Sequence, residues 1–228
     1  MMTKHADLDI EIIRTNRKKT VSLRLRDGQL QMVVPNRMSQ RRINDILTEK
    51  SGWIRKTLQK EALAPVFEPK TYLPGETFMF LGEGYQLALG SEENSWPCLS
   101  KNELIASGGT TSAISTQIHA WYLQSATQHL LQQTTKYAEL MNAKPASVKV
   151  KAYKSRWGAC SARGDLTYNW RIILAPADIV DYVVVHELAH LHHHNHSARF
   201  WACVAETLPD YKERNRWLKE NGSLLRLD

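Results

Sequence analysis

The chain has 228 residues, of which 43% are hydrophobic and 23% charged, and its formal net charge is +7 at pH 7. This composition excludes a disordered chain and suffices to bury one sizeable core or two small ones. Cys98, Cys160 and Cys203 are too few and too far apart for a disulfide framework. The N-terminal residues lack the apolar stretch of a secretory signal, and no apolar run approaches the roughly 18 residues of a membrane span. We therefore expect a cytoplasmic protein with no membrane partner.

The first part of the chain is rich in β-hairpin signals. Alternating apolar and polar residues on either side of Asp27-Gly28 predict a hairpin over 21–35, because this pair accepts the positive φ angles of a tight turn. A helix should begin after Ser39 as N-cap. A linker-like, proline-rich stretch at 64–76 precedes a second predicted hairpin over 77–90, which should turn at Gly82-Glu83-Gly84. The apolar face of the helix is expected to consist of Ile43, Ile46, Leu47, Trp53, Ile54 and Leu58.

After a Gly-Gly break at 108–109 the pattern changes to longer helices. The predicted elements are a helix over 113–142, a strand over 147–153, a hairpin over 155–176, a helix over 177–194 and one or two helices over 197–222. The hairpin at 155–176 should turn at Arg163-Gly164-Asp165, with a second strand from Leu166 to Leu174. We divide the chain near residue 112 into a β-rich N-terminal part, 1–112, and a C-terminal part, 113–228, and find no internal repeat.

The stretch 186-HELAHLHHHNH-196 holds six of the nine histidines. His186 and His190 are four residues apart, so both imidazoles leave the same face of a helix and can bind one ion at the 2.0–2.1 Å typical of zinc. Glu187 emerges about 100° round the helix, where it can reach a water on the open side of the metal. Because the surrounding helix is apolar, its polar side chains need a functional reason. We predict zinc ligands at His186 and His190 and a general base at Glu187.

The third protein ligand that a catalytic zinc requires is less directly encoded. His196 can reach the metal if the helix stops and the chain turns back, for which Asn195 suits a left-handed C-cap and Ser197 an N-cap. The alternatives are His194 on a continued helix and Glu206 or Glu213 on the following one. We prefer His196, then Glu206, and read His192, His193 and His194 as a polar helix end that the helix dipole favours.

From His186 to Trp201, the sequence H-E-L-A-H-L-x-x-x-N-H-S-x-x-F-W resembles the signature of the YgjP-like zinc metallopeptidase family, which is related to the SprT and WLM groups. The runs 155–176 and 209–218 resemble the same family, as does the N-terminal Val-Ser-Leu-Arg-Leu strand with its Asp-Gly turn and a helix ending in Trp53-Ile54. The resemblance implies zinc held by His186, His190 and His196, with Glu187 as catalytic base.

The same resemblance implies an α+β fold of gluzincin-like or minigluzincin-like architecture. A β-hairpin-rich N-terminal part should be followed by a zincin-like catalytic domain, in which a small sheet packs on the helix that carries the HExxH motif. The chain should then be an enzyme, a zinc-dependent metallohydrolase of the metallopeptidase type.

Hydrolysis at such a site also needs a donor for the developing oxyanion. The candidates are Arg156, Tyr153 and Tyr168 in the predicted hairpin, and we prefer Arg156. The alternative for Arg156 is stacking on Trp157, and for the two tyrosines it is ordinary strand packing. We interpret Cys160 as a small buried residue and not as a ligand.

Three functions are consistent with these patterns. The first is a metallopeptidase whose peptide or protein substrate adds to the edge of the small sheet. The second is a nucleoside triphosphate pyrophosphatase acting on UTP, an activity that the resemblance includes, although no phosphate-cradling motif is present. The third is a nucleic-acid-binding module with a structural metal, motivated by the basic stretches 14–19 and 37–42 near Trp53. The sequence carries no signal of oligomeric state.

Overall fold

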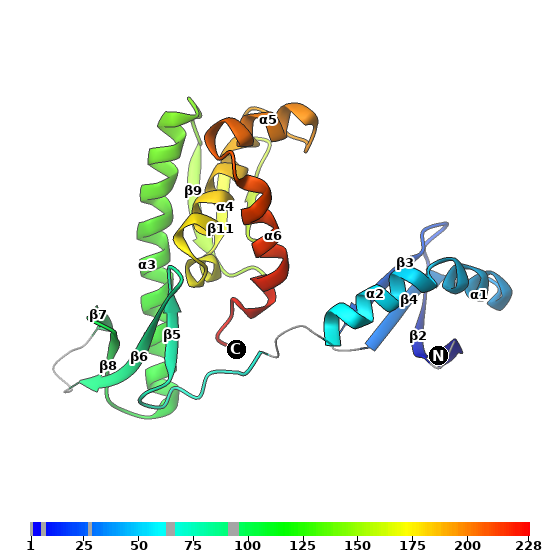
Figure 1. Ribbon diagram of the computed structural model, residues 1–228, viewed down its shortest axis with the longest axis horizontal. Coiled ribbons are helices and arrows are strands. Elements are labelled where there is room, and N and C mark those ends of the chain that lie inside the picture. Colours follow the sequence, from blue (N-terminus) through cyan, green and yellow to red (C-terminus); the bar gives the residue numbers. More distant parts are fainter. Residues whose placement is uncertain (1, 6–7, 27–28, 63–66, 91–95) are drawn as a thin grey trace. The chain divides into compact units, whose positions relative to one another are not determined.

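The fold consists of two compact units, each of which is described by itself. The computed structural model describes residues 2–5, 8–26, 29–62, 67–90 and 96–228 (Figure 1). The units are Met1–Val66 and Phe67–Asp228, and each has its own hydrophobic core. No helix within the described ranges is long and apolar enough to cross a membrane.

The first unit is a four-stranded sheet followed by two helices. Strands β1 (Met2–His5), β2 (Leu8–Thr15), β3 (Ser22–Arg26) and β4 (Gln29–Pro35) lie in the order β1-β2-β4-β3, and helices α1 (Gln40–Glu49) and α2 (Ser51–Ala62) follow. β3 and β4 form the predicted antiparallel hairpin, and its Asp27-Gly28 turn lies outside the described residues. Ser39 caps α1 as predicted, because its side chain accepts a hydrogen bond from the Arg42 N–H.

The core of the first unit joins both helices to the sheet. Ile43, Leu47 and Ile54 are buried against Ile10 and Met32 of the strands. The one predicted helix is divided in two at Lys50, which is the C-cap of α1. Trp53, which we expected on the apolar face, is 45% exposed, whereas the adjacent Ile54 is buried.

The second unit begins with another four-stranded sheet. Strands β5 (Thr77–Phe80), β6 (Glu83–Gly90), β7 (Cys98–Ser100) and β8 (Glu103–Ser107) lie in the order β5-β6-β8-β7. The hairpin predicted over 77–90 is present, but it turns at Leu81-Gly82, one residue before the predicted turn. Leu81 and Gly82 have φ angles of 51° and 86°, as a two-residue hairpin turn requires, and a leucine gives no sequence signal for that conformation.

The remaining elements of this unit surround the histidines. They are α3 (Thr111–Leu140), β9 (Ser147–Lys151), β10 (Gly158–Cys160), β11 (Asp165–Asn169), the 3-10 helix η1 (Trp170–Leu174), α4 (Ala177–Ala189), α5 (Ala198–Thr207), α6 (Tyr211–Asn221) and the 3-10 helix η2 (Gly222–Leu224). β9, β10 and β11 form a three-stranded sheet in the order β10-β11-β9. Where one or two helices were predicted over 197–222, the structure has two, α5 and α6.

One strand arrangement occurs three times along the chain. In β2-β3-β4, β6-β7-β8 and β9-β10-β11, the third strand lies in the middle, parallel to the first and antiparallel to the second. A helix follows each set: α1, α3 and α4, the last after η1. The amino-acid sequence does not reveal this repetition, because strand pairing of this kind tolerates different side chains. Its consequence is that α4, which carries the histidines, follows the central strand of a small sheet through η1 and packs against the edge strand β10.

The predicted second strand of the 155–176 hairpin is shorter than expected. β11 ends at Asn169, and residues 170–174 form η1 instead of a strand. The Asn169 side chain accepts a hydrogen bond from the Arg171 N–H and donates to the backbone carbonyls of Tyr153 and Arg156. This capping amide stops the strand, and four of the five η1 side chains are then buried without the alternation of a strand.

The boundary between compact units also differs from the predicted division near residue 112. That position lies in α3, within the second unit. The reason is a shared core, in which Phe78, Leu87 and Leu104 of the β5–β8 sheet belong to the same cluster as Ile118 and Tyr122 of α3.

Helix α4 is the central element of the second unit. It lies between α3 and α6 in Figure 1 and also contacts α5, β10 and η1. Nine of its 13 residues are buried, among them Val180, Val184 and Leu188. A small sheet packed on this helix is the α+β, zincin-like arrangement that the resemblance implied.

Candidate metal centre

The end of α4 presents two histidines to a cavity of about 350 Å³. His186 lies in the last turn of the helix, and His190 is its C-cap. The helix is shorter than predicted, because tight turns replace it after Ala189: the N–H groups of His192 and His193 both donate to the Ala189 carbonyl. The chain therefore leaves the helix axis directly after the second histidine.

This early helix end brings His196 back beside the other two. The ligand nitrogens of His186, His190 and His196 all lie within 4.8 Å of one another. Asn195 does not take the positive φ angle we expected, since its side-chain oxygen instead accepts a hydrogen bond from the Ser197 N–H at 3.3 Å. Ser197 is the N-cap residue of α5, although its side chain makes no capping hydrogen bond.

The spacing of the three imidazoles fits a tetrahedral metal. The Nε2 atoms of His186 and His196 are 3.1 Å apart. Two nitrogens bonded to one zinc ion at about 2.0–2.1 Å and a tetrahedral angle stand about 3.3 Å apart. Two imidazole nitrogens that face each other at this distance either share a proton or bind the same cation.

Burial favours the neutral, metal-binding form of two of the three imidazoles, those of His186 and His190. Burial, followed by the nearby His190 and His196, lowers the pKa of His186 to about 3. Burial also lowers the pKa of His190. The Nδ1 of His190 lies 3.2 Å from the His193 carbonyl, to which it donates, so its Nε2 keeps the lone pair. Neutral imidazoles with free lone pairs are the donor set that zinc accepts.

Glu187 occupies a dry position beside the histidines. Its side chain is 6% exposed, and burial raises its pKa to about 7, with the nearby Arg156 charge acting in the opposite direction. A carboxyl group with this pKa exchanges protons near neutral pH, which is the property of a general base. Glu187 lines the same cavity as the three histidines.

Three residues near the site were missed by the sequence reasoning. Gly158 of β10 is one, since a Cβ atom there would stand 2.5 Å from the Glu187 Oε1. Phe200 is fully buried, with its ring centroid 5.0, 4.6 and 4.8 Å from those of His186, His190 and His196. Tyr182 packs its ring 5.8 Å from that of His186. A glycine within a strand and a tyrosine four residues before His186 were the available signals.

The other predicted ligands lie elsewhere. Among the described residues, Glu206 and Glu213 do not belong to the group of close ligand atoms. The Nε2 of His192 is 3.0 Å from the Met141 carbonyl, which ties this histidine to the end of α3. His194 is exposed and lines the cavity without joining the group.

The three predicted oxyanion donors do not lie together at the histidine cavity. Tyr168 is fully buried, and its oxygen accepts a hydrogen bond from Thr134, so it is a core residue. Arg156 is exposed at the cavity and lies over the Tyr153 ring at 5.5 Å, not over Trp157 as we had considered. Cys160 is half-buried in the cavity wall, where burial raises the pKa of its thiol.

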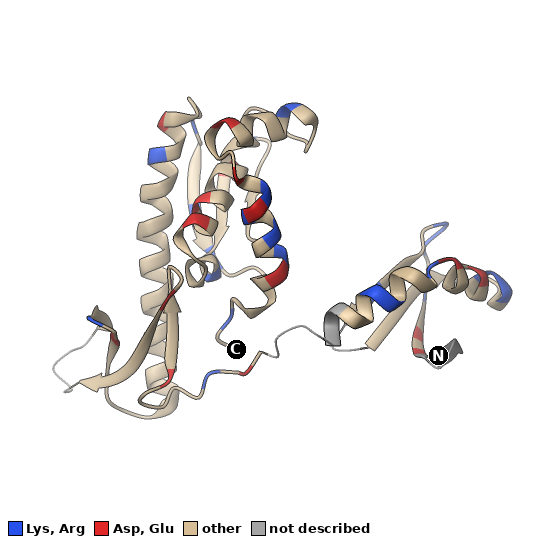
Figure 2. Ribbon diagram, in the orientation of Figure 1, with Lys and Arg blue, Asp and Glu red and all other residues tan. Residues whose placement is uncertain are grey.

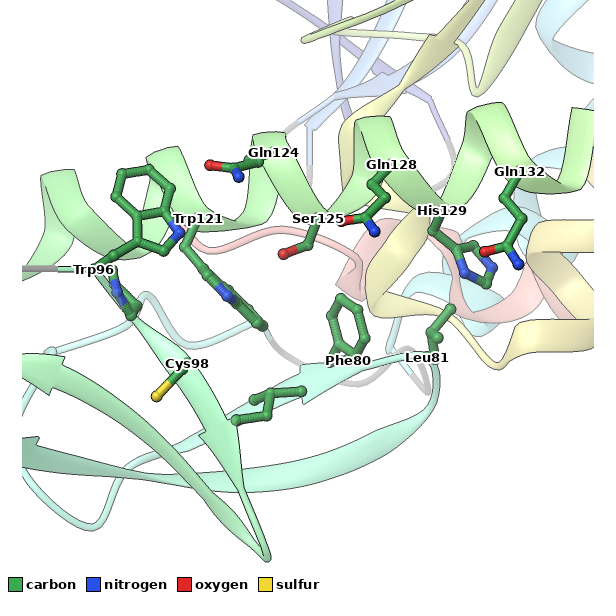
Figure 3. A pocket seen from close by; sticks show the side chains of 12 residues that line it. Phe80, Leu81, Trp96, Cys98, Trp121, Gln124, Ser125, Gln128, His129 and Gln132 are labelled. Atoms are coloured by element: carbon green, nitrogen blue, oxygen red, sulfur yellow. The ribbon is translucent and has the colours of Figure 1, made fainter.

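A separate cavity of about 410 Å³ lies between α3 and the β5–β8 sheet. Figure 3 shows Gln124, Gln128 and Gln132 along α3 on one side and Phe80 and Leu81 on the other. None of the residues that line it is Asp, Glu, Lys or Arg. Within the described residues, the group of close metal-ligand atoms is His186, His190 and His196, which lie at the other cavity.

A small sheet, a buried helix with His-Glu-x-x-His and a third histidine after a chain reversal define the zincin-like class of metal-dependent hydrolase folds. The model of the YgjP-like metallopeptidase domain matches residues 19–221, so the chain belongs to the YgjP-like family. This match confirms the resemblance seen in the sequence.

The comparison with solved structures includes the metallopeptidase zymogen abylysin of Pyrococcus abyssi. It shares 22% identity with the chain at a TM-score of 0.37, over 40% of this chain and 92% of abylysin. No curated protein matches the sequence.

Proposed function

We propose that the protein is a zinc-dependent peptidase, with His186, His190 and His196 as ligands and Glu187 as general base. The observation that supports this most is the placement of a buried carboxyl group, with its pKa raised to about 7, beside three imidazoles whose ligand nitrogens lie within 4.8 Å of one another. The cysteines of the described residues are free, which suits the reducing cytoplasm in which we place the reaction.

The roles of the individual residues follow from their protonation. When bound, zinc lowers the pKa of a coordinated water towards 7 and polarises the substrate carbonyl. Glu187 in its ionised form accepts a proton from the attacking water and, once protonated, delivers it to the amine leaving group. Its low exposure excludes bulk water from the proton that it carries. Arg156, at the open side of the cavity, is the proposed donor to the oxyanion.

The small sheet offers a place for an extended substrate. β10 is an edge strand, and within the described residues it pairs with β11 alone. Gly158, Ala159 and Cys160 of this strand line the histidine cavity. A peptide that adds to the free edge of β10 would carry its scissile bond past Glu187.

Basic side chains next to the cavity support a preference for one kind of peptide. Arg156 also lines a neighbouring groove of about 750 Å³, together with Lys154, Arg171 and Arg226. Asp228 is the one carboxylate that lines this groove, and it pairs with Arg171 at 2.8 Å. We therefore propose that the protein prefers peptides with acidic residues near the cleaved bond.

The test is a mass-spectrometric product search on the zinc-loaded protein. A diverse peptide library and the common nucleoside triphosphates are offered together, and the variants are Glu187→Ala and, as a matched control, Glu206→Ala. Glu206 is exposed on α5 and lies outside the ligand group. New peptide ends should form with the native protein and with Glu206→Ala, and should vanish with Glu187→Ala while zinc stays bound.

Other outcomes identify other functions. Nucleoside monophosphate and pyrophosphate that depend on Glu187 would replace the peptidase proposal with hydrolysis of a nucleotide. Peptide cleavage that persists in Glu187→Ala would contradict the mechanism. Zinc that binds tightly without any Glu187-dependent product would favour a structural metal.

A further inference from the structure

The net positive charge of the protein comes from its first unit. Residues 1–66 contain 14 Lys and Arg against seven Asp and Glu, whereas residues 67–228 contain 16 of each. The net charge of +7 therefore belongs to the first unit, and the unit with the histidines is neutral. In Figure 2 basic and acidic residues are interspersed along α6 of the second unit. The peptidase chemistry does not explain such a separation of charge.

The fold brings two basic stretches of the first unit together. β2 and β4 are parallel neighbours, and their last residues, Thr15 and Pro35, are paired. The segments that follow these strands, 16–19 and 36–42, therefore start side by side at one end of the sheet. Arg14 joins them, because its guanidinium donates to the carbonyls of Asn36 and Met38, both at 2.8 Å.

Further hydrogen bonds hold the two segments in place. The Asn36 N–H donates to the Thr15 carbonyl at 2.9 Å, and the Asn36 side-chain amide donates to Asn16 at 2.6 Å. Ser39 then starts α1, whose first turn contains no acidic residue. The positive end of the α1 helix dipole, with the free N–H groups of its first turn, therefore lies at the same end of the sheet as the two segments.

Six basic residues lie in and beside the two segments at this end of the sheet, and we call them the basic cluster. Its members are Arg17, Lys18, Lys19, Arg37, Arg41 and Arg42, all of them exposed. In the part of the chain that the structure describes, one carboxylate pairs with the cluster, namely Glu49 with Arg42 at 3.7 Å. Both side chains of that pair are more than half exposed, so it neutralises little.

We propose that the basic cluster binds the phosphate backbone of double-stranded nucleic acid, without regard to base sequence. Four of the six cations are arginines, whose planar guanidinium groups suit phosphate oxygens. Between them stand Asn16, Asn36, Gln40 and Thr20, the neutral donors that accompany phosphate contacts. A preformed pair of loops needs no ordering before it binds.

Other polyanions fit this surface less well. An anionic membrane is bound by basic residues together with apolar side chains that insert, and Met38, the one apolar side chain in 36–42, packs against the core instead. Unpaired bases are bound by stacking on aromatic rings, and neither segment contains one. Trp53 follows α1, and the length of that helix, about 15 Å, separates it from the cluster.

Fluorescence anisotropy of the full chain with a short labelled duplex tests this proposal. The affinity should fall steeply between about 50 and 200 mM salt, because bound phosphates release counterions. Two triple variants are compared. One carries Arg17→Gln, Lys18→Gln and Lys19→Gln, and the other carries Arg37→Gln, Arg41→Gln and Arg42→Gln. Each should reduce the slope of log affinity against log salt by about 3. Circular dichroism melting checks that both variants fold.

A control with the same change of charge keeps this test specific. Lys144, Lys212 and Lys219 are exposed in the neutral second unit, and replacing all three by Gln should leave duplex binding unchanged. The proposal is wrong if the duplex does not bind at 50 mM salt or if the cluster variants bind like this control. Tighter binding of a single strand, or of phosphatidylserine vesicles, than of the duplex would also overturn it.

Discussion

Replacing Gly158 by Ala should disable the site without removing its metal. Gly158 lies on β10, opposite the buried carboxyl group of Glu187. A Cβ atom at this position would stand 2.5 Å from Oε1, 2.6 Å from Cγ and 2.7 Å from Cδ of Glu187. The three nearest atoms all belong to Glu187, so the added methyl group acts first on the base.

The size of the effect follows from these distances. Ordinary van der Waals contact begins at 3.4 Å, so the carboxyl group must retreat by about 1 Å. Glu187 is 6% exposed and has little free space into which to move. A displacement of about 1 Å at a catalytic group costs about 100-fold in rate. Overpacking of this kind also destabilises the fold, by about 1–3 kcal/mol.

The assay compares kcat/KM on the best peptide from the library with zinc content and urea unfolding. Gly108→Ala is the matched control, because a Cβ atom at Gly108 meets nothing within 4 Å and its φ angle is not positive. Gly158→Ala should retain zinc, lose about 100-fold in kcat/KM and stay folded. An activity equal to that of Gly108→Ala would refute the assignment of Glu187 as the base beside β10.

Three further changes have defined outcomes. Relative to the native chain, metal-free Glu187→Gln should gain up to about 3 kcal/mol of stability in urea unfolding as the pH rises from 4.5 to 7. The sign follows because burial raises the pKa of Glu187 from 4.5 to about 7, so the folded native chain holds a proton that the unfolded chain has released. His196→Ala should weaken zinc binding by more than about 100-fold in chelator competition, whereas Glu206→Ala should not. Gly82→Ala should cost about 2 kcal/mol or more in urea unfolding, since φ there is 86° and the new Cβ would meet the Pro176 Cα at 2.8 Å.

Local patterns predicted the elements whose determinants are close in sequence. Ser39 caps α1 and the strands on either side of Asp27-Gly28 pair, because a cap and a tight turn depend on neighbouring residues. The ends of β11 and of α4 could not be read in this way. β11 stops where Asn169 reaches back to the carbonyls of Tyr153 and Arg156, which are 16 and 13 residues away.

The residues of the candidate metal centre also differ in how far local sequence predicts them. Two of its histidines follow from the 3.6-residue period of a helix, so their spacing alone placed them on one face. His196 depended on where the helix ends, and the sequence left Glu206 and His194 open as rivals. Gly158 belongs to no motif around Glu187, because the approach of β10 to α4 is a tertiary contact.

Phe200 explains how the imidazoles keep their orientation with few hydrogen bonds. Metal-binding histidines normally donate their second nitrogen to a fixed acceptor. His190 does so to the His193 carbonyl, but the buried Nδ1 of His186 has no partner among the described residues. The Phe200 ring, which no water reaches, touches all three imidazoles and limits their rotation by packing.

Packing of this kind ties the metal centre to the position of α5, on which Phe200 lies. The turn from His190 to Ser197 must therefore position both the proposed ligand His196 and the Phe200 ring that packs on all three imidazoles. A helix that continued to residue 194 would deliver neither. The short α4 is thus what makes the three-histidine arrangement possible, and the run His192–His194 is the segment in which the chain reverses.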